Sequence, residues 1–214
     1  MRVLVTLGPT QEPIDPVRYI SNRSSGRMGA ALAREGLKRG HEITIISGPV
    51  NIPLPEGARI HRVTTSGQMI KTTLSELEKG YDVMISAAAI SDYSVDYKEK
   101  KIDSGRELSL KLKPQVKLTK HAKELYPKTL VVAFKAETNA KGDELVKKAR
   151  KKIHDEGVDL VVANDVSGRV FGSGENEVYI VNGGVLHVPR ASKALVSEKI
   201  WDAVESKIQI LLLR

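Results

Sequence analysis

Residues 3–29 read VLVTLGPTQEPIDPVRYISNRSSGRMG, an apolar segment followed by a long run rich in Gly, Pro, Ser and Arg. An apolar strand over residues 2–7 is predicted to enter a long loop before a helix begins near Ser25. Connections between a strand and a helix usually have about 2–6 residues, and longer ones are usually functional. Ser24 or Ser25 can cap the helix, whose free N–H groups and dipole attract an anion. The stretch therefore predicts the first strand, loop and helix of an α/β fold, with an anion site between them.

Arginines are concentrated around this predicted anion site. Arg18, Arg23 and Arg27 lie within ten residues of one another in the sequence and can supply charged hydrogen-bond donors. A well-capped helix with scattered surface arginines would explain the same motif equally well. The motif alone therefore leaves both interpretations open.

The rest of the chain alternates predicted strands with predicted helices. Strands are expected at residues 41–47, 59–64, 81–90, 130–137 and 158–165, and helices at 25–39, 66–79, 141–156 and 191–213. A glycine-rich loop at 168–177 precedes a hairpin that turns at residues 182–184. Residues 91–106 are polar and unpatterned, and residues 107–113 alternate as a half-exposed strand does. This order predicts one doubly wound α/β domain over residues 1–214 with a mostly parallel sheet and a small β excursion.

Composition excludes several classes of protein. The chain has 214 residues and no cysteine, which excludes disulfides, thiolate metal sites and cysteine nucleophiles. The first strand follows Met1 directly, and no apolar run approaches the roughly 20 residues that a membrane helix needs. We therefore expect no signal peptide, no membrane span and a cytoplasmic location.

The net charge of +8 raises the question of a nucleic-acid partner. The lysines, however, are mixed with acidic residues, and no aromatic residues alternate with them as stacking on single strands would require. We therefore expect no nucleic-acid binding, and a basic nucleic-acid-binding domain is kept as an alternative. An NAD(P)-binding oxidoreductase is the other alternative. It is disfavoured because Gly26-x-x-Gly29 is not the glycine turn of dinucleotide-binding folds.

Unusual loops follow several predicted strands at their carboxyl ends. Residues 87–89 are three alanines before Asp92, residues 134–135 are Phe-Lys, and residues 164–165 are Asn-Asp. Ligands of doubly wound sheets bind beyond the carboxyl ends of the strands. Small alanines there let a base or ribose approach the backbone, although tight helix–sheet packing explains them equally well. The pattern predicts where a ligand binds and leaves its identity open.

The opening motif resembles that of the phosphopantothenate–cysteine ligase family of coenzyme A biosynthesis. The resemblance continues through ISGPV, AAAISDY, the lysines at 100–101, AFKAETN, ARKKI, LVVANDVSG and FGSGENEV. It implies a Rossmann-like fold with a flexible flap, a homodimer, and the joining of 4′-phosphopantothenate to L-cysteine. The reaction would pass through an acyl-nucleotide and consume a nucleoside triphosphate with Mg²⁺. Members are often fused to a flavin-dependent decarboxylase, which we expect here to be absent or on a separate chain.

The resemblance also implies roles for individual residues. Asn22 would polarise the acyl group, and Arg18 would support this step. Lys101 on the flap would close over the intermediate, with Lys100 as the alternative if the register differs by one residue. It leaves the metal ligands unknown. The implied nucleotide-binding residues are Gly8, Thr10, Ser24, Ser25, Gly26, Ala87, Ala88, Ala89, Asp92, Lys101, Phe134 and Lys152.

The chain departs from the bacterial pattern of this family at three places. Gln115-Val116-Lys117-Leu118 stands for Asn-Pro-Asp-Ile, Glu156 stands where a second lysine is expected, and Asp103-Ser104 replaces a pair of flap lysines. Bacterial members use CTP and the eukaryotic branch uses ATP. The resemblance therefore favours CTP and leaves ATP possible.

Overall fold

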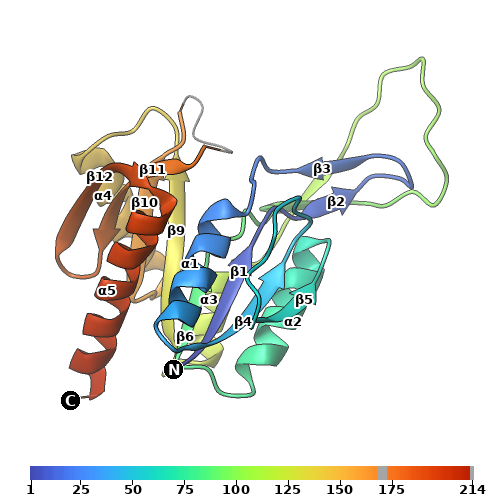
Figure 1. Cartoon of the computed structure of the whole chain (residues 1–214). Coiled ribbons are helices and arrows are strands. Elements are labelled where there is room, and N and C mark those ends of the chain that lie inside the picture. The colour runs from blue at the N-terminus through green and yellow to red at the C-terminus, as the bar shows by residue number, and fades with distance from the viewer. Residues whose placement is uncertain (168–172, 213–214) are drawn as a thin grey trace.

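A mixed eight-stranded sheet forms the body of the computed structural model, which describes residues 1–167 and 173–212 (Figure 1). The strand order is β12-β11-β10-β9-β6-β1-β4-β5. Neighbours from β10 to β5 run parallel, whereas β11 and β12 form an antiparallel hairpin at one edge. The strands are β1 (Arg2–Leu7), β4 (Glu42–Ser47), β5 (Arg59–Arg62), β6 (Val83–Ser86), β9 (Leu130–Glu137), β10 (Leu160–Asp165), β11 (Glu175–Val181) and β12 (Val185–Ser192).

Helices cover both faces of this sheet. One face carries α1 (Arg27–Lys38) and α5 (Lys193–Leu212), and the other carries α2 (Ser66–Leu77), α3 (Leu118–Leu125) and α4 (Asp143–Glu156). Successive side chains of a strand point to opposite faces. In β1, Val3 and Val5 therefore pack with α1 and α5, whereas Leu4 packs on the other face. The predicted doubly wound, mostly parallel fold is confirmed.

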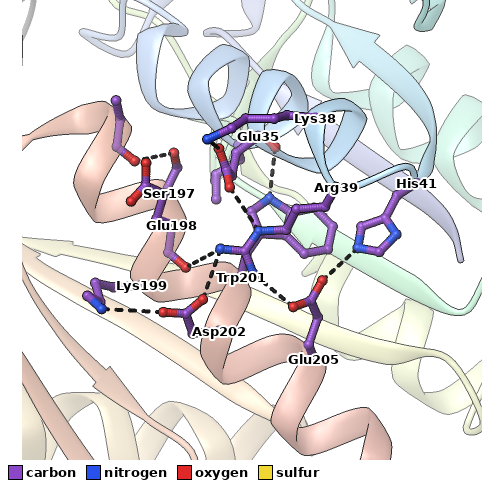
Figure 2. A network of polar contacts seen from close by, with 12 residues as sticks. Glu35, Lys38, Arg39, His41, Ser197, Glu198, Lys199, Trp201, Asp202 and Glu205 are labelled. Atoms are coloured by element: carbon purple, nitrogen blue, oxygen red, sulfur yellow. Dashed lines mark hydrogen bonds and ion pairs between the residues drawn. The ribbon is translucent and has the colours of Figure 1, made fainter.

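The contact between α1 and α5 is tight and polar at its rim. A Cβ atom at Gly36 would lie 2.6 Å from Cζ2 of Trp201, so only glycine lets the two helices approach this closely. Trp201 is fully buried and donates its indole N–H to the carbonyl of Leu32. Beside it, Arg39 lies within 2.9 Å of carboxylate oxygens on Glu35, Asp202 and Glu205 (Figure 2). This network joins the first helix to the last.

Two small antiparallel sheets lie outside the body. In one, β2 (Gln11–Pro13) pairs with β3 (Tyr19–Ser21), and in the other β7 (Tyr93–Val95) pairs with β8 (Leu112–Pro114). Figure 1 shows the β2–β3 hairpin and the green segment that joins β7 to β8 projecting together away from the main sheet. We call residues 11–21 and 93–114 the arm, and residues 96–111 within it the flap.

The structure differs from the predicted secondary structure at residues 107–113 and at α3. Only the end of the strand expected at 107–113 forms, because β8 pairs with β7 over just three residues. The helix α3 was not predicted, since it has eight residues, no side-chain cap and only three buried positions. The hairpin at 182–184 is confirmed, and the first part of the glycine-rich loop, residues 168–172, lies outside the described residues. None of the helices in the described part of the chain is both long and apolar enough to cross a membrane.

Candidate functional site

A cavity of about 180 Å³ opens where α1 begins and where the central strands end. It lies at the carboxyl ends of β6, β9 and β10, next to β1. From β1 the chain first adds β4 and β5 on one side of the sheet and then β6, β9 and β10 on the other side. This is the switch point at which doubly wound folds bind ligands. Its lining residues are Ser24, Ser25, Gly26, Arg27, Met28, Gly29, Ala87, Ala88, Ala89, Phe134, Ala136, Asn164, Val166, Asn176 and Lys193.

Glycines bring the beginning of α1 against the sheet. Gly26 has a φ of 73°, which side chains rarely allow, and a Cβ at Gly29 would lie 2.5 Å from Cβ of Leu7. The prediction that Ser24 or Ser25 caps the helix is wrong. The N-cap is Gly26 and no side chain caps α1; the Ser24 hydroxyl instead accepts a 3.4 Å hydrogen bond from the Gly26 N–H. The uncapped, positive end of α1 thus lines the cavity, where it favours an anion.

Asn22 is held at the alanine segment by its side-chain amide. Its Nδ2 donates to the carbonyl oxygens of Ala89, at 3.4 Å, and Ile90, at 3.1 Å. Gly8 and Thr10 support the same segment from the other side, through backbone hydrogen bonds to Ala89 of 2.9 and 3.2 Å. The predicted residues Gly8 and Thr10 therefore shape the site without lining the cavity, and Asn22 lies beside it.

Two lining residues, Lys193 and Asn176, escaped the sequence analysis. The Lys193 ammonium donates to the carbonyls of Ser173 and Glu175, at 2.7 and 2.8 Å. Burial lowers the pKa of Lys193, and the nearby charge of Arg27 lowers it further. Asn176 is buried and its Oδ1 lies 3.4 Å from Nδ2 of Asn164. Asn176 lies in the FGSGENEV motif, to which no role was assigned, whereas no motif marks Lys193, because only the packing of α5 on α1 brings it to the cavity.

Two predicted nucleotide-binding residues form ion pairs outside the cavity, one at the residue before β7 and one on α4. Asp92 pairs with Lys117 at 2.5 Å, and both side chains are exposed. Lys152 pairs with Glu156 at 2.7 Å, and Glu156 also accepts a hydrogen bond from the Thr119 hydroxyl. Neither Asp92 nor Lys152 lines the cavity. Glu156, which stands in place of an expected lysine, neutralises the charge of Lys152.

The arm carries the remaining predicted residues. Arg18 does not line the cavity: it contacts Asp15 at 2.7 Å and donates to the carbonyl of Ile102 in the flap. Lys101, the residue before Ile102, has an exposed side chain. Arg18 thus bonds to the flap backbone at the residue that follows Lys101, another predicted catalytic residue.

A larger cavity of about 570 Å³ lies beside the beginning of α4 and the β11–β12 hairpin. None of the predicted catalytic or nucleotide-binding residues lines it, whereas seven of them line the smaller cavity at the switch point. Among the described residues, no group of three or more His, Asp or Glu side chains is placed to hold a metal ion. The candidate site is therefore the smaller cavity together with Asn22 beside it.

The chain has relatives among known proteins. Residues 1–208 match the family described as DNA/pantothenate metabolism flavoprotein C-terminal domain. The chain is 45% identical over 210 residues to the coenzyme A biosynthesis bifunctional protein CoaBC of Thermococcus kodakarensis, covering 97% of the chain and 51% of that protein. It is 37% identical over 211 residues to the Bacillus subtilis protein of the same name, covering 94% and 50%. The chain thus spans about half the length of these relatives.

Solved structures share the fold. The C-terminal domain of a CoaBC protein superposes with a TM-score of 0.82 at 29% identity, covering 97% of this chain and 95% of that one. The DNA/pantothenate metabolism flavoprotein of Streptococcus pneumoniae gives 0.85 at 27% identity, covering 96% and 99%. A Cab2 mutant in complex with phosphopantothenate-cysteine gives 0.76 at 19%, covering 97% and 87%, which shows a common fold. The chain therefore belongs to the family of DNA/pantothenate metabolism flavoprotein C-terminal domains.

Proposed function

We propose that the chain is a ligase that joins 4′-phosphopantothenate to L-cysteine at the expense of a nucleoside triphosphate. The observation that carries the proposal is the cavity at the switch point, which combines the uncapped end of α1 with Arg27 and Lys193 and lies beside the Asn22 amide. The first step brings the anionic 4′-phosphopantothenate against the anionic triphosphate, which requires positive charge and fixed orientation more than covalent help from the protein. Membership of a family whose relatives are named for coenzyme A biosynthesis supplies the substrate class.

The reaction has two steps. The substrate carboxylate attacks the α-phosphate, forming a C(O)–O–P bond while pyrophosphate leaves. The cysteine amine then attacks the acyl carbon, the nucleoside monophosphate leaves with the C–O electron pair, and the amine gives up a proton. In this proposal Asn22 gives up its 3.4 Å hydrogen bond to the carbonyl of Ala89 and donates that N–H to the acyl oxygen as negative charge develops there. The N-terminal end of α1, with Arg27 and Lys193, binds the phosphates.

We propose that the nucleotide enters as its magnesium complex, because Mg²⁺ is commonly bound through substrate phosphates with few protein ligands. The segment Ala87–Ala89 and Phe134 would contact the base and ribose, and backbone groups at the alanines suit either base. The bacterial motif is lost at residues 115–118, and Lys117 there pairs with Asp92. We therefore propose CTP as the preferred nucleotide, with less discrimination against ATP than the bacterial pattern implies.

The same proposal includes partners. The relatives are named as bifunctional proteins, and we propose that a flavin-dependent decarboxylase supplies the other activity. We further propose a cytoplasmic homodimer, with part of its interface on the arm.

A reconstitution assay tests the function. The purified chain would be incubated with 4′-phosphopantothenate, L-cysteine, Mg²⁺ and equal concentrations of CTP and ATP. Mass spectrometry would detect phosphopantothenoylcysteine and compare CMP with AMP. We expect product only when all substrates are present, with CMP in excess. No product with either nucleotide would refute the ligase, and AMP as the main product would refute the preference for CTP.

A control assay addresses the two alternatives. Thermal unfolding would be followed with CTP, ATP, NADP and a DNA duplex, because a ligand that binds the folded state stabilises it by mass action. We expect stabilisation by the nucleoside triphosphates. Stabilisation by NADP or DNA alone would favour the alternatives.

A further inference from the structure

Asp15 lies in the turn of the β2–β3 hairpin, buried between this turn and the flap. Only 2% of its surface is exposed. Its Oδ1 accepts the backbone N–H groups of Val17, at 2.8 Å, and Arg18, at 2.9 Å. This half of the carboxylate closes the turn in the way that aspartate side chains commonly do.

The other oxygen of Asp15 reaches outside its own hairpin. Oδ2 accepts the backbone N–H of Ile102 at 3.1 Å and the Nε–H of Arg18 at 3.0 Å. The Arg18 guanidinium in turn donates to the carbonyl of Ile102. The peptide groups on both sides of Ile102 are thereby fixed, and the first of them is the one that joins it to Lys101.

A charged carboxylate is required for this arrangement. Burial opposes ionisation of Asp15, but the backbone N–H groups of Val17, Ile102 and Arg18 and the Arg18 guanidinium outweigh it and hold its pKa far below the usual range. Every hydrogen-bond partner of Oδ2 is a donor, so an acceptor must occupy that position. The contact holds the flap at Ile102, in a segment that connects β7 to β8 without regular structure.

We propose that Asp15 is a positioning residue that clasps the flap to the hairpin and thereby sets the position of Lys101 for the reaction. The proposal rests on the proposed ligase function for its kinetic consequence, but the clasp itself does not depend on that function. Arg18 belongs to the same clasp, because it donates hydrogen bonds to both Asp15 and Ile102. The carboxylate acts through the backbone of the flap and does not touch substrate.

The substitution Asp15→Asn separates the two halves of the carboxylate. An asparagine keeps an oxygen that closes the turn, but places an NH₂ group where Ile102 and Arg18 both donate. We expect a lower melting temperature, because two buried donors lose their acceptor, but a folded protein at the assay temperature, a fall in kcat of at least tenfold, and a KM for the nucleotide within twofold of wild type. The matched control is Asp96→Asn, which removes an exposed carboxylate paired with Lys113 in the same arm and should leave kcat within twofold.

A double-mutant cycle distinguishes positioning from a general structural role. Lys101→Gln removes the group that the clasp positions, so Asp15→Asn should lower kcat by less than twofold in that background. If the two losses instead multiply, or if Asp15→Asn alone keeps kcat within twofold of wild type, the proposal is overturned. Should Asp15→Asn not fold, Ile102→Pro removes the same N–H from the flap side and is expected to give the same loss.

Trypsin digestion tests the clasp without substrates. Release of the flap should speed cleavage after Lys100 and Lys101 at least fivefold in Asp15→Asn relative to Asp96→Asn, at a temperature at which both variants are fully folded. Equal cleavage rates would overturn the clasp. A wild-type chain that makes no phosphopantothenoylcysteine would refute the ligase proposal, while the digestion would still decide the role of Asp15.

Discussion

The side-chain amide of Asn22 bonds to the carbonyls of Ala89 and Ile90, next to the cavity, and this position gives the proposed reaction its sharpest test. Replacing Asn22 with alanine removes the donor to the acyl oxygen but leaves the phosphate-binding groups in place. We expect the acyl-nucleotide to accumulate and the cysteine adduct to form more than tenfold more slowly, a loss of about 1.4 kcal/mol. Rapid quenching with labelled nucleotide measures both species.

Asn51→Ala is the control for this prediction, since Asn51 is exposed in a loop and absent from the cavity lining. It should turn over like wild type. Formation of the cysteine adduct by Asn22→Ala within tenfold of wild type would remove Asn22 from the acyl-transfer step.

Some residues of the site were predictable from the sequence, and others were not. Ser24, Ser25 and the alanines at 87–89 could be predicted because they lie in loops at strand ends, and such loops meet at one edge of a parallel sheet. Lys193 could not, because it reaches the cavity only through the packing of α5 on α1. The serine cap failed because the turn before α1 needs a positive φ, which Gly26 supplies.

At the scale of elements, the Arg39 network joins α1 to α5 (Figure 2). Arg39→Met would keep the apolar stem and leave the carboxylates of Glu35, Asp202 and Glu205 without their shared cation. Breaking a fully buried ion pair costs about 3–5 kcal/mol, but Asp202 and Glu205 are 50% and 34% exposed, and water screens their charges. We therefore expect a smaller loss, of about 1–3 kcal/mol, in the free energy of unfolding, measured in urea. Arg34→Met, at an exposed position on the same helix, should change the stability little.

Glu76, on α2, makes the stability of the fold depend on pH. It is almost fully buried and accepts hydrogen bonds from Lys79, at 2.6 Å, and Tyr81, at 3.0 Å. Burial raises its pKa, but these bonds and the charge of His61 lower it below the ordinary 4.5. A lowered carboxyl pKa stabilises the fold above the unfolded pKa, and this stabilisation is lost as pH falls through the folded pKa.

Glu76→Gln should therefore cost about 1–3 kcal/mol at neutral pH, where the wild-type carboxylate is charged. The difference between the two proteins should shrink as the pH falls below 4.5 and through the lowered pKa of the folded state, because the wild-type carboxyl then becomes neutral as well. Urea unfolding at several pH values measures both curves. A difference that is constant from neutral to acidic pH would contradict the linkage.

Elements with strong periodicity were predictable, and elements that depend on distant partners were not. The buried strands and the helices α1, α2, α4 and α5 follow from apolar patterns in the sequence. The alternation of Leu108, Leu110 and Leu112 suggested a long strand, but β7 offers a partner for three residues only. A strand exists only where another strand completes its hydrogen bonds.

At the scale of the whole molecule, exposed apolar side chains are concentrated on the arm. Val17, Tyr19, Leu108, Leu110 and Leu112 are each between 37% and 62% exposed. Exposed apolar side chains gathered on one part of a molecule often mark an interface, and we therefore predict a homodimer that buries part of the arm. Light scattering at micromolar concentration should give twice the mass of the chain. A monomeric mass would refute the prediction.

The substitution Leu110→Glu locates this interface, since a charge there would have to be buried in the dimer. It should shift the equilibrium toward the monomer. Leu195→Glu, at an exposed position on α5, should leave the dimer intact. The reverse result would move the interface from the arm to α5.

Trp201 has a further consequence, because it is the only tryptophan of the chain. Its indole is buried against α1 and bonds to Leu32, a residue 169 positions away in the sequence. Its fluorescence therefore reports one event, the docking of the last helix onto the first. A stopped-flow refolding trace of tryptophan fluorescence would therefore measure the rate at which the first and last helices meet, and not the formation of individual strands or helices. Bringing together two segments so far apart in the sequence closes a long loop, which carries an entropic cost.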